Sequence, residues 1–208
     1  QVTEDGKQNE VLNGIPDWVY EEEFSFNRAL EFSADSQMLA FIRFDEKDVP
    51  SYSFPLFAGQ APHFTPFEKY PGEYTYKYPK TGEVNSKVSV HTFDIKINVP
   101  VDADGYIPRI RFTQDPNKLA VMTLNRHQNR FDLYFADPRS TVAKLALRDE
   151  SDTYIRENVF DNIVFYPENF SFVSEKSGYN HLYWYSIGGN LLKQVTAGPY
   201  EVQEFLGY

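Results

Sequence analysis

FSADSQMLAF at residues 32–41 and FTQDPNKLAV at residues 112–121 share the pattern that decides the fold of this chain. Each stretch opens on Phe and a hydroxyl residue, passes through a polar turn, and resumes with Leu-Ala and a large apolar residue. The turns contain Asp35 and Asp115 at the same place in the pattern. Alternating runs on either side of such a turn are typical of a β-hairpin. We therefore expect the same antiparallel strand pair twice.

A longer repeat surrounds these hairpins. Residues 129–135 (NRFDLYF) align with residues 178–184 (GYNHLYW), about 50 positions later. Residues 165–173 fall where the strand pair should recur with a tighter turn, and residues 191–196 suit an outer strand. A repeat of roughly 50 residues built of about four short strands is the signature of propeller blades. The sequence predicts an all-β fold, a partial β-propeller of about four blades with four-stranded antiparallel sheets, and a short helix near 17–23.

The spacing of the two hairpins leaves room for a long insertion. The excess over one repeat lies in residues 49–79, which are rich in proline, glycine and aromatic residues. Long insertions between paired strands are usually functional. We expect this segment, the arm, to project from its blade and to offer apolar surface to another chain. Its candidate contact residues are Tyr52, Phe54, Phe57, Phe64 and Phe67.

Both ends of the chain resemble parts of further blades. Residues 1–12 look like the tail of an earlier blade, and residues 202–208 look like the first strand of a later one. A closed propeller usually has more than four blades. We therefore expect the chain to be a piece of a larger protein, residues 1–208 forming part of one propeller domain.

The composition excludes several classes of function. Among 208 residues, 20 Lys and Arg stand against 30 Asp and Glu, a formal net charge of -10, which does not suit nucleic-acid binding. The charge suits a cationic ligand, but many soluble proteins are acidic, and both interpretations stay open. Cysteine is absent, so we expect no disulfide and no thiolate chemistry. No apolar run approaches the ~20 residues of a membrane span, and the N-terminal residues are too polar for a signal peptide.

The sequence predicts no metal and no cofactor. The histidines are scattered along the chain, at positions 63, 91, 127 and 181. The segment DADG at 102–105 resembles the start of a calcium loop, but Thr113 stands where an EF-hand needs a glutamate. We expect a plain turn there.

Three consecutive glutamates, Glu21, Glu22 and Glu23, stand in the stretch IPDWVYEEEF at 15–24. One interpretation is a solvated face of a short helix, with Asp17 as its N-cap. Successive helical side chains point ~100° apart, so three glutamates cannot share one face, but two adjacent ones can converge on a small cation. Composition favours the solvated face.

The stretch NGIPDWVYEEEF at 13–24 resembles the signature of the dipeptidyl peptidase IV family of serine exopeptidases. Four further stretches agree with that family in order. They are the hairpin at 32–41, YPKTGEVN at 78–85, LNRHQN at 124–129 and GYNHLY at 178–183. The absence of cysteine is similar to the bacterial members rather than to the disulfide-bearing animal ones. The resemblance covers essentially the whole chain.

The resemblance implies an eight-bladed N-terminal propeller over a C-terminal α/β-hydrolase domain, which supplies Ser, Asp and His. The parent enzyme would release Xaa-Pro or Xaa-Ala dipeptides from free N-termini of peptides. Glu22 and Glu23 would hold the substrate's α-amine, and Phe160 would lie beside its second residue. A core position for Phe160 is the alternative that the residues themselves favour. The family also implies a homodimer through the arm and a periplasmic or secreted location.

The chain departs from the family in one respect. It contains no Gly-x-Ser-x-Gly nucleophile elbow, and its histidines lack triad partners at a recognisable spacing. We expect the catalytic domain to be absent from this chain, which would then hold the recognition half and be inactive alone. The other hypothesis is a non-catalytic propeller that serves as a protein-interaction module.

Overall fold

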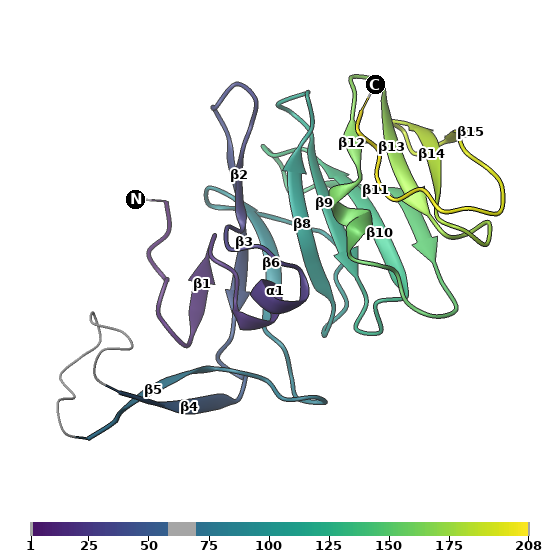
Figure 1. Cartoon of the computed structure of the whole chain (residues 1–208). Coiled ribbons are helices and arrows are strands. Elements are labelled where there is room, and N and C mark those ends of the chain that lie inside the picture. Colours follow the sequence, from purple (N-terminus) through teal and green to yellow (C-terminus); the bar gives the residue numbers. More distant parts are fainter. Residues whose placement is uncertain (1, 58–69, 208) are drawn as a thin grey trace.

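The computed structural model describes residues 2–57 and 70–207, and the regular secondary structure of these residues is almost entirely antiparallel β-strand (Figure 1). The strands are β1 (Val11–Asn13), β2 (Leu30–Phe32), β3 (Leu39–Asp45), β4 (Ser51–Leu56), β5 (Gly72–Lys77), β6 (Lys87–Thr92), β7 (Ile95–Ile97), β8 (Tyr106–Phe112), β9 (Leu119–Leu124), β10 (Arg130–Ala136), β11 (Ala143–Glu150), β12 (Val164–Phe165), β13 (Asn169–Ser174), β14 (His181–Ser186) and β15 (Leu191–Gln194). The helices are α1 (Trp18–Glu23) and α2 (Asn158–Asp161). Within this part of the chain, no helix has the length and apolar character needed to cross a membrane.

Three sheets stand side by side like the blades of a propeller (Figure 1). The first has the order β1-β3-β6-β7, with β2 also paired to β3; the second is β8 to β11 and the third β12 to β15, each in sequential order. Strands β4 and β5 form a separate two-stranded ribbon. The predicted fold class is confirmed. The four sheets of the described residues are three blades and one ribbon, because the residues between β3 and β6 leave the first blade.

The repeated pattern forms the same hairpin twice, as predicted. Phe32 pairs with Leu39 and Phe112 pairs with Leu119, at equivalent places in β2–β3 and β8–β9. In each turn the aspartate accepts a backbone N–H two residues on, from Gln37 to Asp35 (3.1 Å) and from Asn117 to Asp115 (2.9 Å). Such side-chain closure of a turn is why aspartate is favoured there.

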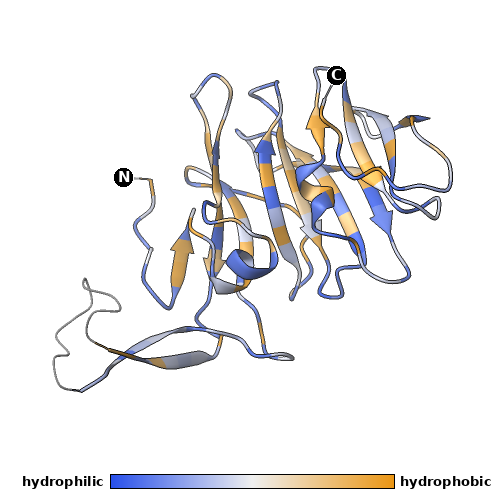
Figure 2. Cartoon of the chain, viewed as in Figure 1, coloured by the Kyte–Doolittle hydropathy of each residue, from blue (hydrophilic) through white to orange (hydrophobic). Residues whose placement is uncertain are grey.

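The core lies between neighbouring sheets. Every residue of β9 is buried, which explains why its sequence LAVMTL does not alternate. Phe131 of the second sheet stacks on Phe172 of the third, with ring centroids 5.4 Å apart. Figure 2 shows the corresponding band of hydrophobic residues along the central strands.

The first strand of the first blade is interrupted by α1. Strands β1 and β2 both pair with β3, and Ile42 lies between them. Its carbonyl accepts the N–H of Gly14 (3.0 Å) and its N–H donates to Ala29 (2.9 Å). Residues 15–28 therefore leave one edge strand and return to it; we call them the excursion. Gly14 has φ +71, and a Cβ there would lie 3.2 Å from the Leu30 side chain, so glycine is favoured at the exit point.

The two ends of the chain differ from the sequence prediction. Val11 and Leu12 belong to β1 and so to the first sheet, rather than to a separate earlier blade. Residues 202–207 form no strand; their contact with the third sheet includes a hydrogen bond from Val202 to Asn180 (2.8 Å). An extended segment needs a neighbouring strand to form a ladder, and none of the described strands runs beside it.

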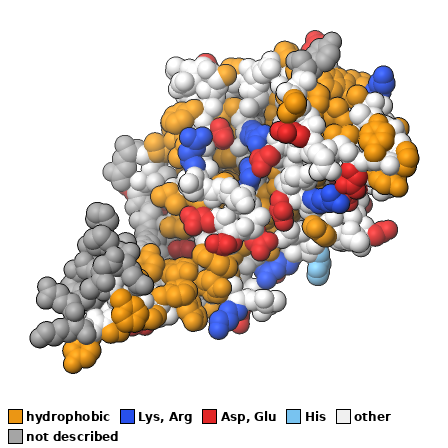
Figure 3. All heavy atoms as spheres, viewed as in Figure 1, with side chains coloured by type: hydrophobic (Ala, Val, Ile, Leu, Met, Phe, Trp, Pro, Cys, Tyr) orange, Lys and Arg blue, Asp and Glu red, His pale blue; other side chains and the backbone are white. Residues whose placement is uncertain are grey.

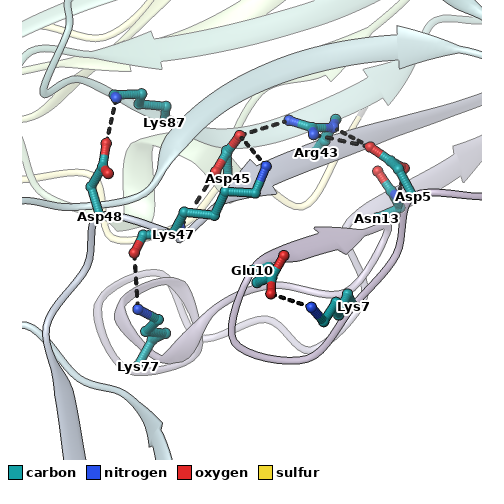
Figure 4. A network of polar contacts seen from close by, with 10 residues as sticks. All are labelled: Asp5, Lys7, Glu10, Asn13, Arg43, Asp45, Lys47, Asp48, Lys77 and Lys87. Carbon is teal, nitrogen blue, oxygen red and sulfur yellow. Dashed lines mark hydrogen bonds and ion pairs between the residues drawn. The ribbon is translucent and has the colours of Figure 1, made fainter.

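The ribbon of β4 and β5 extends away from the blades (Figure 1). Its root is held by Lys77, whose ammonium donates to the carbonyls of Lys47 (3.0 Å) and Val49 (2.7 Å). Lys87 of β6 pairs with Asp48 beside it (2.6 Å), and Figure 4 shows this pair together with the contact of Lys77 with Lys47. Phe64 and Phe67 of the predicted arm, like His63, lie outside the described residues.

Candidate functional site

Asp17 starts α1 by capping its first turn, as the sequence predicted. One carboxylate oxygen accepts the backbone N–H of Tyr20 (3.1 Å), and the other accepts the hydroxyl of Ser86. The side chain is buried, and this burial raises the pKa of Asp17. Both oxygens are thus committed to structure, so Asp17 serves to fix the helix.

Two aromatic residues hold α1 in place. Tyr20 is 1% exposed, and its hydroxyl accepts the backbone N–H of Ile107 on β8 at 2.9 Å. Burial raises the pKa of Tyr20 well above its usual value, so the phenol is neutral. Trp18 packs on Tyr78 at the root of the ribbon, with ring centroids 4.1 Å apart. The helix is therefore fixed to the second blade on one side and to the arm on the other.

Glu21, Glu22 and Glu23 are all exposed on this fixed helix. Among the described residues, no hydrogen bond or ion pair engages the carboxylate of Glu22 or Glu23. Figure 3 shows acidic side chains gathered over α1, beside the hydrophobic surface that leads to the ribbon. Desolvation raises the pKa of Tyr76 on β5, with smaller contributions from Tyr78, Tyr74 and Glu22. The arrangement offers two adjacent negative groups on a rigid support.

The structure places Phe160 in the core. The residue is 0% exposed and lies on α2, with its ring 5.9 Å from Phe24 and 5.9 Å from Phe131. It therefore has the core packing that the residues favoured and contacts no solvent in this structure. Phe24 directly follows Glu23, so Phe160 supports the end of the helix that carries the glutamates.

Two arginines on β8 lie near this site and were not singled out from the sequence. Arg109 donates to both oxygens of Asp161 (3.1 and 3.0 Å), and Arg111 donates to the same carboxylate (2.7 Å). The Arg109 guanidinium also lies 4.9 Å from the ring of Phe26. The sequence feature that could have indicated them is the alternation Arg-Ile-Arg at 109–111, which in a strand places both guanidinium groups on one face of the sheet. What they pair with depends on a residue about 50 positions away.

A cavity of about 420 Å³ lies between α1 and the ribbon. Its lining includes Asp17, Trp18, Glu21, Glu46, Tyr74, Tyr76 and Lys77. Glu46 is 4% exposed, and its burial, with a smaller effect from the neighbouring charge of Asp17, raises its pKa to about 7. Glu46 follows a strand and has no local signal in the sequence. A larger cavity of about 690 Å³ lies between loops of the second and third blades and is not lined by the glutamates of α1.

Smaller predictions have clear outcomes. Residues 102–105 form a turn closed by a hydrogen bond from Gly105 to Asp102 (2.9 Å), as expected. Arg130 pairs with Asp102 (2.7 Å). Arg126 donates to the carbonyl of Glu83 (2.9 Å). In the part of the chain that the structure describes, neither of these arginines pairs with a glutamate of α1.

Comparison with known proteins matches the whole chain to one family. Residues 1–208 match the model described as the dipeptidyl peptidase IV N-terminal region. The probable dipeptidyl peptidase 4 of Aspergillus fumigatus is 31% identical over 223 residues, which cover 99% of this chain and 28% of that protein. The dipeptidyl peptidase 4 of Trichophyton rubrum is 31% identical over 225 residues, with 99% and 28% covered.

Solved structures show the same similarity. The crystal structure of Porphyromonas gingivalis dipeptidyl peptidase 4 superposes with a TM-score of 0.88 at 44% identity, covering 98% of this chain and 29% of that one. A putative dipeptidyl aminopeptidase IV from Bacteroides ovatus has a TM-score of 0.80 at 22% identity, covering 100% and 31%, which shows a shared fold. The chain spans less than a third of the length of these relatives.

Proposed function

Because the chain belongs to the dipeptidyl peptidase IV family, whose N-terminal region it matches along its whole length, we propose that it is the substrate-recognition part of a serine exopeptidase. The parent protein removes dipeptides from free N-termini, with proline or alanine as the second residue. Its C-terminal α/β-hydrolase domain supplies the Ser, His and Asp. The chain by itself is inactive, and the parent works in the periplasm or outside the cell.

In this proposal Glu22 and Glu23 anchor the α-ammonium group of the substrate. The observation that carries it is their exposure, without a partner among the described residues, on a helix fixed by Asp17 and Tyr20. An ammonium has three donors, and two adjacent carboxylates accept two or more of them as charge-assisted hydrogen bonds. Each such bond is worth about 1.5–3 kcal/mol when well placed.

The place of the two glutamates in the helix supports this role. Glu22 and Glu23 are the last two residues of α1, and the last turn contains no basic residue. Carboxylates near a helix C-terminus face its partial negative charge and are disfavoured by about 0.3–1 kcal/mol. A sequence that keeps an unfavourable local arrangement commonly does so for function. A bound cation would remove the repulsion.

The anchor also accounts for cleavage near the N-terminus alone. A fixed site for the amine leaves room for a set number of residues before the nucleophile of the hydrolase domain. An internal peptide bond brings no ammonium, so two carboxylates would be covered by substrate without a counter-charge, which is costly. Specificity for a free amine would therefore come from the propeller.

The test is a comparison of three matched variants in the full-length protein. Glu22→Gln and Glu23→Gln each remove a charge and keep the shape, and each should lower kcat/KM for Gly-Pro-p-nitroanilide by about tenfold or more, since about 1.4 kcal/mol is tenfold. Glu21→Gln changes the neighbouring exposed glutamate and should leave kcat/KM within about twofold. Normal kcat/KM in both Glu22→Gln and Glu23→Gln would show that the run is a solvated helix face.

The same experiment separates the enzyme from an interaction module. A non-catalytic propeller would give no turnover in the unmutated full-length protein. If turnover is absent, a Gly-x-Ser-x-Gly segment with later Asp and His should also be absent downstream in the gene.

The arm completes the proposal as a dimer contact. Tyr52, Phe54, Phe57 and Tyr70 are exposed by 40%, 37%, 51% and 81% along the ribbon. Contiguous apolar surface of this kind usually marks an interface. We assign it to a second copy of the parent chain, because the ribbon stands apart from the blades.

A further inference from the structure

We propose that Arg109 is a positioning residue for the amine anchor: it ties the excursion that carries Glu22 and Glu23 to α2, the short helix between the second and third blades. This inference rests on the proposed role of the two glutamates. Arg109 would not touch the substrate; it would act by fixing the positions of Glu22 and Glu23.

The contacts of Arg109 join three segments. Its Nε and Nη2 donate to the two oxygens of Asp161 at 3.1 and 3.0 Å, and its Nη1 donates to the carbonyl of Pro108 at 2.8 Å. The Cζ of the guanidinium lies over the ring of Phe26, 4.9 Å from its centroid. The arginine side chain is 14% exposed and Asp161 is 53% exposed, so the guanidinium is largely buried while the carboxylate that holds it faces water. A planar fork can pair in its plane and stack on its face at once, which a lysine cannot do.

The stacked ring belongs to the part of the excursion that most needs support. Ser25, between Phe24 and Phe26, has φ +53, a conformation that non-glycine residues seldom adopt. Such a backbone persists only when the surroundings hold it. On the inner side, Phe24 packs against Phe160 of α2 at 5.9 Å. On the outer side, Phe26 meets Arg109, which Asp161 of α2 holds in turn.

The helix also has supports that are independent of Arg109, and the Tyr20 ring contacts Phe24 and Phe26 with centroids 5.1 and 5.9 Å apart. Asp17 and Tyr20 fix the start of α1 through hydrogen bonds that do not involve Arg109. Loss of the Arg109 contacts should therefore leave the helix formed and loosen its C-terminal end, where Glu22 and Glu23 lie. Two carboxylates that must meet one ammonium lose much of their effect when displaced by about 1 Å.

Arg111 shares the carboxylate but has a different place. It donates to Asp161 (2.7 Å) and to the carbonyl of Ile163 (3.4 Å), and it makes no hydrogen bond, ion pair or ring contact with the described residues of the excursion. Arg111 therefore holds Asp161 in position, whereas Arg109 links Asp161 to Phe26 of the excursion.

The test uses the full-length protein and a free-amine dipeptide substrate. Arg109→Lys keeps the charge but loses the fork and the stack, and should lower kcat/KM on the order of fivefold to tenfold, mainly through KM. Asp161→Asn, which removes the charge of the partner and keeps its shape, should act in the same direction. Circular dichroism and thermal unfolding should stay close to those of the unmutated protein.

A matched control comes from the same blade. Arg148 donates to both oxygens of Asp132 (2.7 and 2.8 Å), the same kind of pair, between β10 and β11. Arg148→Lys should leave kcat/KM unchanged. A decrease in Arg148→Lys equal to that in Arg109→Lys would overturn the proposal, because a general loss of rigidity would then explain both.

A double-mutant cycle tests the route of action. If Arg109 acts through the glutamates, Arg109→Lys should cost much less in a Glu22→Gln background than alone. Full additivity, or unchanged kcat/KM in Arg109→Lys, overturns this inference while the effects of Glu22→Gln and Glu23→Gln stand. If those two variants have no effect, the amine anchor itself is wrong and this inference falls with it.

Discussion

The hydroxyl of Tyr20 accepts the backbone N–H of Ile107 at 2.9 Å, across 87 positions of the chain. Both residues are buried, at 1% and 0% exposed. One hydrogen bond thus fixes the helix of the first blade to a buried residue of β8 in the second blade. Because α1 is a short helix inserted in an interrupted strand, its position depends on such contacts rather than on its own length.

Tyr20→Phe should loosen this attachment without emptying the core. The buried N–H of Ile107 would lose its acceptor, at a cost of about 1–3 kcal/mol. We expect hydrogen exchange in a peptide covering β8 to speed up by about tenfold or more, since about 1.4 kcal/mol is tenfold. The kcat/KM of the full-length protein should fall by roughly threefold or more, because the glutamates lose part of their support.

The control for Tyr20→Phe is Tyr183→Phe. Tyr183 is also buried, and its hydroxyl donates to Ser177 (2.8 Å) within the third blade. This variant should leave both kcat/KM and the exchange of β8 unchanged. Unaltered exchange of β8 in Tyr20→Phe would contradict the role given to the hydrogen bond.

The amine anchor predicts that kcat/KM decreases at alkaline pH because the substrate's own amine loses its proton. A free α-amine has a pKa of about 7.7–8.0, and only its protonated form offers three donors to Glu22 and Glu23. The kcat/KM of the full-length protein should therefore fall as pH rises through that range. A substrate with a less basic amine should shift this decrease to lower pH by the difference in amine pKa.

An N-acetylated substrate provides the matching comparison, because it carries no ammonium at any pH. It should be nearly inert with the unmutated enzyme. A decrease that stays at one pH for substrates of different amine pKa would belong to a group of the enzyme and would argue against the anchor.

The proposed role of the arm predicts that substitutions on the ribbon change the oligomeric state of the full-length protein. Replacing Phe54 and Phe57 with serine removes exposed apolar surface from the ribbon, and should convert a dimer of the full-length protein into a monomer in analytical ultracentrifugation. The control replaces Leu191 and Leu192, which are exposed by 51% and 55% on the edge strand β15. A dimer that survives the ribbon variant and is lost in the control would place the interface elsewhere.

Glu46 predicts a pH dependence of stability. Burial raises its pKa to about 7, above its ordinary value of 4.5. Below pH 4.5 the carboxyl is protonated in both states; as pH rises through 4.5 to about 7 the unfolded chain ionises first, so this contribution to stability is lost. Glu46→Gln removes the titration. The melting temperature of the full-length variant, relative to that of the unmutated protein, should therefore be higher at mildly alkaline pH than at acid pH, by about 2–4 °C or more.

The control for Glu46 is Glu73→Gln, which alters an exposed carboxylate on β5 of the ribbon. It should shift the melting temperature equally at both pH values, by a small amount. Equal behaviour of Glu46→Gln and Glu73→Gln would show that Glu46 is solvated in the folded protein.

The sequence determined the fold class and the place of the candidate site. Alternating runs around Asp35 and Asp115 specify hairpins through contacts between near neighbours, and such contacts are readable from order and spacing. The cap at Asp17 and the glutamates that follow are likewise local. A helix at 18–23 could therefore be placed to within a residue.

Tertiary structure decided what surrounds that helix. The contact of Tyr20 with Ile107, the pairing of Arg109 with Asp161 and the burial of Phe160 between Phe24 and Phe131 each join residues far apart in sequence. The same holds for Glu46, whose carboxyl titrates near neutral pH only because the chain folds over it. Periodicity records which face of an element is apolar, but not which distant element covers it. The packing of the blades therefore decided which residues support Glu22 and Glu23. The local sequence was enough to predict the two glutamates themselves.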